Sequence, residues 1–211
     1  MRTRIKLCGF SSQDTVLAAR KAGADAVGFV FYPPSPRHVE LDQVVELVRC
    51  MGAWQSPVAL FVNPEPTLVQ AVIKRIPQVI LQFHGDESPE FCDGFAHPYL
   101  KAVRMKAGVD LLEQSRLFHN AQALLVDSWS ESYGGTGHTF DWSLLPKEGE
   151  LKQGLVLSGG LDETNVAKAI QSIKPYGVDV SSGIESQRGV KSIDKIEAFC
   201  KAVLAADAKQ L

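Results

Sequence analysis

The chain has 211 residues, of which 45% are hydrophobic and 22% are charged, and its formal net charge is −2 at pH 7. These proportions fit an ordinary globular protein and exclude a disordered or collagen-like chain. The near-neutral charge predicts no basic surface for nucleic acid or an anionic membrane, and no apolar run approaches the roughly 20 residues of a membrane span. We therefore expect one cytoplasmic domain over residues 1–211 that acts on a small molecule.

Short segments rich in β-branched residues alternate along the chain with longer amphipathic stretches. The repeat of roughly 20 to 30 residues is typical of parallel strands joined by crossover helices. We expect strands at Arg4–Cys8, Ala26–Phe31, Pro57–Val62, Val79–Phe83, Leu100–Arg104, Ala123–Asp127, Gly154–Leu157 and Val178–Ser181. Polar or acidic residues mark expected helix starts at Ser12, Asp42, Glu65, Ser88, Asp110, Asp141, Asp162 and Ser192.

Eight similar units in strict alternation predict an α/β fold of one closed (βα)8 TIM barrel. A doubly wound open sheet is the alternative, but it rarely uses eight equal units, and no GxGxxG motif follows the first strand. The longest irregular stretch, Ser128–Thr139, is glycine-rich and is either a lid or a long surface loop. Active sites of such barrels lie at the carboxyl ends of the strands, so the residues there are the functional candidates.

Cys8 is the cysteine that the pattern places at a strand end. The other three, Cys50, Cys92 and Cys200, fall in predicted helices, where a thiol is usually a small core residue. The chain has no CxxC pair, which argues against a disulfide or a structural zinc site in a reducing compartment. Cys8 is therefore the candidate for chemistry.

Side-chain alternation sends Ile5 and Leu7 of the first strand toward the helices, and Lys6 and Cys8 into the barrel. The same rule turns Asp179 of the eighth strand inward. Because the first and eighth strands are neighbours in a closed barrel, Lys6 and Asp179 can form a buried ion pair beneath Cys8. If Asp179 leaves part of the charge of Lys6 unneutralised, that charge favours the Cys8 thiolate.

Asp127 ends the sixth strand and is expected at the same mouth of the barrel as Cys8. A thiol and a carboxyl group that face one pocket can serve as proton acceptor and proton donor. The alternative is structural, with Asp127 capping the following turn and Cys8 merely packing. The joint presence of both residues at strand ends favours the chemical interpretation.

Two loops predict a phosphate site, because glycines let backbone N–H groups approach an anion and this fold often binds phosphate after its last two strands. Ordinary strand–helix turns also use Gly and Ser, so the signal is the pair of loops in these positions. The residues are Ser158, Gly159 and Gly160 after the seventh strand, and Ser181, Ser182 and Gly183 after the eighth.

Three further side chains are candidates for substrate contact. Arg37 follows the second strand in a loop stiffened by three prolines, and either binds a carboxylate or phosphate or is solvated. His84, after the fourth strand, either contacts substrate or forms a structural hydrogen bond, and Arg104 either contacts substrate or pairs with a nearby acid. The histidines have no HxH or HExxH spacing, so we expect no metal.

An ordered set of motifs runs nearly from end to end of the chain. Its segments are Lys6–Gly9, Ala24–Phe31, Ser35–Arg37, Gln82–Gly85, Leu125–Asp127, Gly134–Gly137, Leu157–Leu161 and Asp179–Glu185. This set resembles that of the phosphoribosylanthranilate isomerases of tryptophan biosynthesis.

The resemblance implies a cofactor-free Amadori rearrangement of N-(5-phosphoribosyl)anthranilate to 1-(2-carboxyphenylamino)-1-deoxyribulose 5-phosphate. It makes Asp127 the general acid that opens the ribose ring and Cys8 the general base that removes the C2 proton. It assigns Arg37 to the anthranilate carboxylate, and the loops after the seventh and eighth strands to the phosphate. A thiol with a pKa of about 8.5 is only a few per cent ionised at pH 7, so a lowered pKa of Cys8 would favour this role.

Other functions stay open. One is the aminoimidazole carboxamide ribotide isomerase type of histidine biosynthesis, which uses two aspartates and against which Cys8 argues. Another is a non-catalytic barrel that binds a phosphosugar, and a third is a redox-active cysteine protein, which the lack of a nearby resolving cysteine disfavours. The expected partner is a small phosphorylated substrate, and the chain itself is either a monomer or a homodimer.

Overall fold

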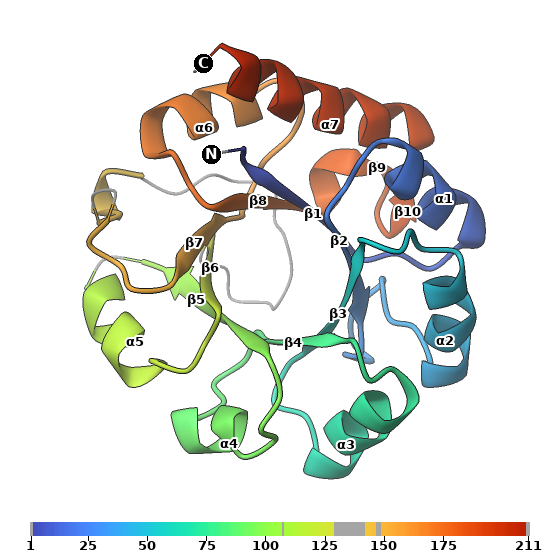
Figure 1. The fold of residues 1–211 in the computed structure, drawn as a ribbon, viewed down its shortest axis with the longest axis vertical. Coiled ribbons are helices and arrows are strands. Elements are labelled where there is room, and N and C mark those ends of the chain that lie inside the picture. Colours follow the sequence, from blue (N-terminus) through green and yellow to red (C-terminus); the bar gives the residue numbers. More distant parts are fainter. Residues whose placement is uncertain (1, 107, 129–141, 147–148, 210–211) are drawn as a thin grey trace.

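The computed structural model describes residues 2–106, 108–128, 142–146 and 149–209, and within them eight parallel strands close into a barrel (Figure 1). Each strand pairs with the next, and β8 pairs with β1. The predicted TIM barrel is therefore confirmed, and each strand boundary differs from its prediction by no more than one residue. The strands are β1 Arg4–Cys8, β2 Ala26–Val30, β3 Ser56–Phe61, β4 Ile80–Phe83, β5 Tyr99–Met105, β6 Ala123–Ser128, β7 Gly154–Leu157 and β8 Gly177–Val180.

Helices surround the barrel in Figure 1. They are α1 Gln13–Lys21, α2 Leu41–Arg49, α3 Pro66–Arg75, α4 Pro89–Asp93, α5 Leu111–Leu117, α6 Val166–Ile173 and α7 Ile193–Ala208. Five predicted helix starts occupy the N-cap position, namely Ser12, Glu65, Ser88, Asp110 and Ser192. The last three of these also accept hydrogen bonds from backbone N–H groups of the first turn. The predicted start at Asp162 is wrong: Asp162 accepts N–H bonds in a turn, and α6 begins after Asn165.

The connection from β6 to β7 departs from the expected alternation of eight strands and eight helices. Its described part contains only a 3-10 helix, η1 (Trp142–Leu144), in place of the predicted α-helix. The predicted helix start at Asp141 and the glycine-rich stretch, with Gly134, Gly135 and Gly137, lie outside the described residues. The lid hypothesis for that stretch stays a prediction.

A short unpredicted element follows β8. The 3-10 helix η2 (Ser182–Ile184) leads into an antiparallel hairpin of β9 (Glu185–Gln187) and β10 (Val190–Lys191). Gly189 in its turn has φ of +85°, a backbone conformation that favours glycine. The hairpin lies beside the loop after β2, because a Cβ on Gly189 would come within 2.8 Å of the Pro36 carbonyl oxygen.

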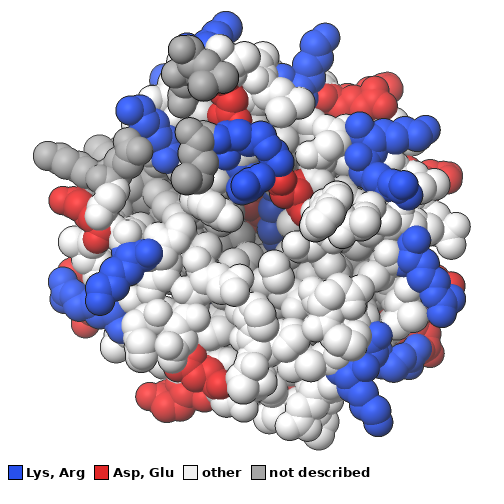
Figure 2. Space-filling model, in the orientation of Figure 1, with Lys and Arg blue, Asp and Glu red and all other residues white. Residues whose placement is uncertain are grey.

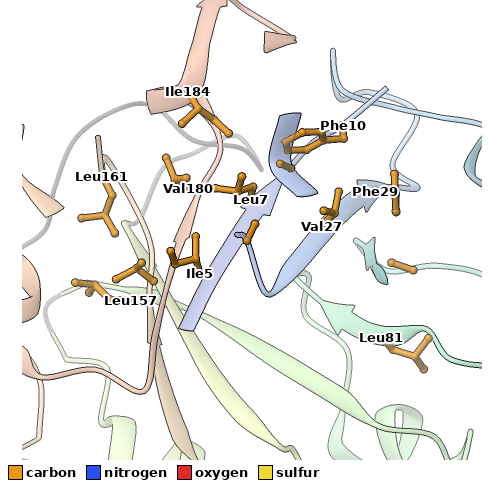
Figure 3. Close-up of a cluster of buried hydrophobic side chains, with 14 of the residues drawn as sticks. Ile5, Leu7, Phe10, Val27, Phe29, Leu81, Leu157, Leu161, Val180 and Ile184 are labelled. Carbon is orange, nitrogen blue, oxygen red and sulfur yellow. The ribbon is translucent and has the colours of Figure 1, made fainter. Parts of the chain in front are cut away.

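The main hydrophobic core lies between the outer faces of the strands and the helices. Ile5 and Leu7 belong to it and are fully buried, as alternation predicted, and Figure 3 shows them close to Val27 and Val180 of the neighbouring strands. Burial of each such side chain contributes about 1.5–3 kcal/mol. The apolar faces of β1, β2 and β8 therefore fix which residues of these strands point into the barrel.

Inside the barrel, the side formed by β5, β6 and β7 is apolar, whereas the side formed by β1 and β8 carries charged groups. A small apolar cluster of Ala102, Ala123, Leu125 and Val156 fills the side of β5 to β7. On the side of β1 and β8, Lys6 and Asp179 form the predicted buried ion pair, with 2.7 Å between Lys6 Nζ and Asp179 Oδ1. The register of β1 and β8 places these two residues directly opposite each other.

The face shown in Figure 2 has Lys and Arg side chains interspersed with Asp and Glu around its rim, and a mostly uncharged middle. Charge of one sign is not gathered into a single patch on this face, so it offers no extended basic surface. None of the helices in the described parts of the chain is both long and apolar enough to cross a membrane.

Candidate active site

A pocket at the carboxyl ends of the strands brings together nearly all of the predicted site residues. Gly183 and Arg104 are the exceptions, because they do not line the pocket. A Cβ on Gly183 would collide with the Leu161 carbonyl oxygen, so this glycine lets the loops after β7 and β8 pack closely. The predicted residues that line the pocket are Cys8, Arg37, His84, Asp127, Ser158, Gly159, Gly160, Ser181 and Ser182. Apolar neighbours from β2 and β3, Val30 and Leu60 among them, complete the wall.

Cys8 ends β1 and is 4% exposed, with Lys6 one inward position below it. Burial raises the pKa of the Cys8 thiol, the charge of Lys6 opposes that effect, and Asp179 adds to it. The net direction is upward, so the thiolate is less populated in the free protein than for an ordinary cysteine. The charge of Lys6 alone would favour the thiolate, but in the free protein desolvation of the buried thiol outweighs the effect of this cation.

Gly28 of β2 makes the space that the thiol occupies. It is the register partner of Cys8, and a Cβ at position 28 would lie 2.8 Å from Cys8 Sγ. Real Cβ atoms do not approach sulfur so closely, so any larger residue would displace the thiol. Sequence reasoning missed Gly28, although a glycine inside a strand is a signal for close approach of another group.

Asp127 lies one residue before the end of β6, is 8% exposed and faces His84, which directly follows β4. His84 Nε2 lies 3.3 Å from Asp127 Oδ2, and His84 Nδ1 lies 3.0 Å from Gln82 Nε2. With the Gln82 amide as donor, Nδ1 accepts and the Nε2–H group of a neutral His84 points at the carboxylate. The structural hydrogen bond predicted for His84 is present, and His84 also lines the pocket, so its contact with substrate stays a prediction.

Arg37 is not solvated, and its partner is a carboxylate that the sequence did not reveal. The guanidinium makes a bidentate ion pair with Glu185, at 2.6 Å from Nε to Oε1 and 2.9 Å from Nη2 to Oε2. Burial by itself would raise the pKa of Glu185, but hydrogen bonds from Arg37 and Lys191 outweigh it and hold the value at about 2. Glu185 is therefore ionised at neutral pH and fixes the plane of the guanidinium.

The loops after β7 and β8 meet beside Cys8. Gly159 and Gly160 have φ of +85° and +66°, conformations that expose backbone N–H groups. Ser181 Oγ donates to the Cys8 carbonyl oxygen at 3.1 Å, and Ser158 Oγ donates to Asp179 Oδ2 at 3.2 Å. The loop after β8 is thus tied directly to β1, the strand that carries the thiol, and the loop after β7 is tied to β8.

Arg104 takes the second of its predicted roles. Its Nη2 lies 2.8 Å from Asp86 Oδ1, and it does not line the pocket. Within the described parts of the chain, no three His, Cys, Asp or Glu side chains gather into a possible metal site. The expectation of a metal-free, cofactor-free reaction stays a prediction.

A closed (βα)8 barrel with a thiol, a carboxyl group and two glycine loops at one mouth is typical of barrel enzymes that act on small phosphorylated molecules. Comparison with known proteins narrows the class. Residues 5–202 match the family model of N-(5'phosphoribosyl)anthranilate (PRA) isomerase, and the chain belongs to that family. It is an isomerase of tryptophan biosynthesis.

The relatives cover the whole chain. It is 48% identical over 207 residues to N-(5'-phosphoribosyl)anthranilate isomerase of Dechloromonas aromatica, across 98% of this chain and 99% of that protein. It is 49% identical over 209 residues to the enzyme of the same name from Methylibium petroleiphilum, across 99% of this chain and 97% of that protein.

Solved structures agree with the fold. Phosphoribosyl anthranilate isomerase from Thermotoga maritima superposes with a TM-score of 0.88 at 36% identity, over 96% of this chain and 99% of that one. A second structure, of the isomerase in complex with reduced 1-(o-carboxyphenylamino)-1-deoxyribulose 5-phosphate, gives a TM-score of 0.84 at 34% identity, with the same coverage. A third is of monomers generated from the dimeric Thermotoga maritima enzyme.

Proposed function

We propose that the chain converts N-(5-phosphoribosyl)anthranilate into 1-(2-carboxyphenylamino)-1-deoxyribulose 5-phosphate, with Asp127 as general acid and Cys8 as general base. The observation that carries this proposal is the placement of both residues in the wall of one pocket, at the ends of β6 and β1. The reduced product analogue bound by a structural relative supports the choice of substrate.

The first step is ring opening. A protonated Asp127 gives its proton to the ribose ring oxygen as the bond from that oxygen to C1 breaks, and the anthranilate nitrogen supplies the electron pair that forms a C1=N iminium. Asp127 leaves this step as a carboxylate. His84 Nε2 lies 3.3 Å from Asp127 Oδ2, and its N–H group can stabilise the negative charge that develops on the carboxylate.

The second step is proton abstraction at C2. The iminium acidifies the C2 hydrogen, the Cys8 thiolate removes it, and the released electrons form a C1=C2 bond while the iminium electrons return to nitrogen. The resulting enolamine then tautomerises to the ketone: C1 takes up one proton and the C2 hydroxyl releases one as the C2=O bond forms. Cys8 and Asp127 return to their starting states by exchanging protons with solvent. The substrate's own iminium is the electron sink, so the proposal includes no cofactor and no metal.

Two sets of polar groups at the pocket suit the two charged ends of the substrate. We assign the anthranilate carboxylate to Arg37, and the phosphate to Ser158, Gly159 and Gly160 together with the Ser181 to Gly183 loop. The ion pair with Glu185 uses Nε and Nη2 of Arg37, which leaves the Nη1 edge for the substrate. Val30 and Leu60 offer an apolar wall for the aromatic ring.

The rival functions predict different results. A histidine-pathway isomerase would turn over the aminoimidazole carboxamide substrate, and a binding barrel would turn over neither. The test follows turnover of phosphoribosylanthranilate by the loss of anthranilate fluorescence, and turnover of the aminoimidazole carboxamide substrate, which has no anthranilate group, by chromatographic separation of substrate and product. Both are measured for the wild-type chain, Cys8→Ala and Asp127→Ala. We expect wild-type turnover of phosphoribosylanthranilate and a loss of about 10²–10⁴-fold in each variant. Near-wild-type turnover by either folded variant would contradict the roles assigned to Cys8 and Asp127.

We expect this chain to be either a monomer or a homodimer. The Thermotoga maritima relative is described as dimeric. Sedimentation velocity over a range of protein concentrations distinguishes the two states.

A further inference from the structure

A buried cluster of charge lies behind the pocket wall, on the hairpin that the sequence did not predict. Lys191 of β10 places its Nζ 2.8 Å from Glu185 Oε1, and both side chains are almost inaccessible, at 2% and 4% exposure. Glu185 in turn holds Arg37. Neither Glu185 nor Lys191 lines the pocket, so neither belongs to the groups that meet the substrate.

The Glu185 carboxylate is saturated with donors. Oε1 accepts from Arg37 Nε at 2.6 Å and from Lys191 Nζ at 2.8 Å, while Oε2 accepts from Arg37 Nη2 at 2.9 Å and from the Gly189 amide at 3.1 Å. Four donors on two oxygens define the position of the carboxylate. A bidentate partner then defines the plane and direction of the Arg37 guanidinium.

Lys191 also connects this carboxylate to the loop after β8. Its Nζ also donates to the Ser181 carbonyl oxygen at 2.9 Å and lies 3.2 Å from Ser181 Oγ, and the same hydroxyl donates to the Cys8 carbonyl oxygen. One ammonium group therefore contacts the carboxylate that aims Arg37 and the residue that begins the anion loop after β8.

The stem of Arg37 is confined as well. Gly9, directly after Cys8, has φ of +86°, and a Cβ there would lie 2.6 Å from Arg37 Cδ. The arginine stem thus runs across the backbone of Gly9 and ends on Glu185. Without Glu185 the guanidinium would be a buried cation beside a second cation, Lys191, and both would be driven to new positions.

We propose that Glu185 and Lys191 are positioning residues, a charge pair that aims Arg37 at the substrate carboxylate and sets its distance from the anion loop at Ser181. This inference rests on the proposed function, because it takes Arg37 as the group that binds the anthranilate carboxylate. A correctly placed binding group stabilises the bound substrate and the transition state by the same amount. Loss of the correct placement therefore raises KM and leaves kcat nearly unchanged.

The test uses the double variant Glu185→Gln/Lys191→Met. It removes one negative and one positive charge together, which keeps the charge balance of the buried cluster and lets the barrel fold. We expect KM for phosphoribosylanthranilate to rise about tenfold, with kcat within about twofold of wild type. Circular dichroism and thermal unfolding confirm the folded state before kinetics are measured.

A double-mutant cycle with Arg37→Met separates positioning from general structure. If the pair acts through Arg37, the tenfold rise in KM disappears when Arg37 is already Met, because there is no guanidinium left to aim. The same rise in KM in both backgrounds would overturn the inference, as would a KM that does not change or a loss that falls mainly on kcat.

The single variant Lys191→Met tests the link from Lys191 to Ser181. It keeps the ion pair of Arg37 and Glu185, and it should weaken competitive inhibition by inorganic phosphate. Unchanged inhibition would contradict the link to Ser181.

The matched control is Asp207→Asn in α7. Asp207 accepts hydrogen bonds from the Thr3 amide and hydroxyl at 2.8 and 2.7 Å, beside the start of β1 and away from the pocket. Its loss costs stability without contact to Arg37, so KM and kcat should stay at the wild-type values. If the wild-type chain itself fails to turn over phosphoribosylanthranilate, the proposed function fails, and that result is distinct from failure of the positioning role.

Discussion

The space beside the Cys8 thiol gives the sharpest quantitative prediction, through Gly28→Ala. Carbon and sulfur atoms in contact normally lie about 3.5–4.0 Å apart, whereas the new methyl group would lie 2.8 Å from Cys8 Sγ. The thiol must therefore move by about 1 Å, or the β1 and β2 backbones must separate. A displacement of that size at a reacting group costs on the order of 100-fold in rate.

The expected result is a kcat about 100-fold below wild type, with a loss of about 1–3 kcal/mol in the free energy of unfolding from overpacking. Turnover is followed by anthranilate fluorescence and stability by urea denaturation. The control is Gly52→Ala, where the nearest atom to the new methyl group is Arg20 Cγ at 3.5 Å, an ordinary contact. A folded Gly28→Ala protein with kcat within threefold of wild type would refute the argument that the position of the thiol governs the reaction.

Three further predictions follow from the charges near the site. Burial raises the pKa of Cys8, so its alkylation by iodoacetamide should be slow at pH 7 and rise about tenfold per pH unit through pH 9; a rate that levels off below pH 8 would contradict this. The pKa of Glu185 falls from 4.5 to about 2 on folding, so it contributes on the order of 3 kcal/mol above pH 4.5 that is lost as the pH falls toward 2. Glu185→Gln should therefore flatten acid unfolding, followed by circular dichroism, in that window, and an unchanged acid limb would argue against the ion pair. Arg104 pairs with the largely exposed Asp86 outside the pocket, so Arg104→Ala should leave kcat and KM within twofold; a larger loss would place it in the site.

The sequence predicted those features that depend on periodicity. Side-chain alternation along β1 and β8 has a period of two, and the closed barrel makes these strands neighbours, so the pair of Lys6 and Asp179 could be predicted before any coordinates. The same reasoning brought Cys8 and Asp127 to one mouth. Strands and helices have regular repeats, so the direction of a side chain on them can be predicted from its place in the repeat.

Features of the loops could not be predicted in this way. Arg37 and Glu185 are 148 residues apart, and their contact depends on the conformations of two loops and on the β9–β10 hairpin, which has no periodic signal. The raised pKa of Cys8 was missed because the degree of burial, which outweighs the charge of Lys6, is a property of packing. Gly28 was missed because the sequence does not show which atom lies opposite a glycine.

The central claim is that Cys8 and Asp127 perform the proton transfers, while other residues of the site bind the substrate. Measuring ligand binding and turnover on the same variants tests this claim most directly. Reduced 1-(o-carboxyphenylamino)-1-deoxyribulose 5-phosphate, the ligand of a structural relative, serves as the unreactive probe. For Cys8→Ala and Asp127→Ala we predict a Kd for this probe within about threefold of wild type and a kcat lower by about 10²–10⁴-fold. A kcat near the wild-type value in either folded variant, or a Kd that rises as much as kcat falls, would contradict the account.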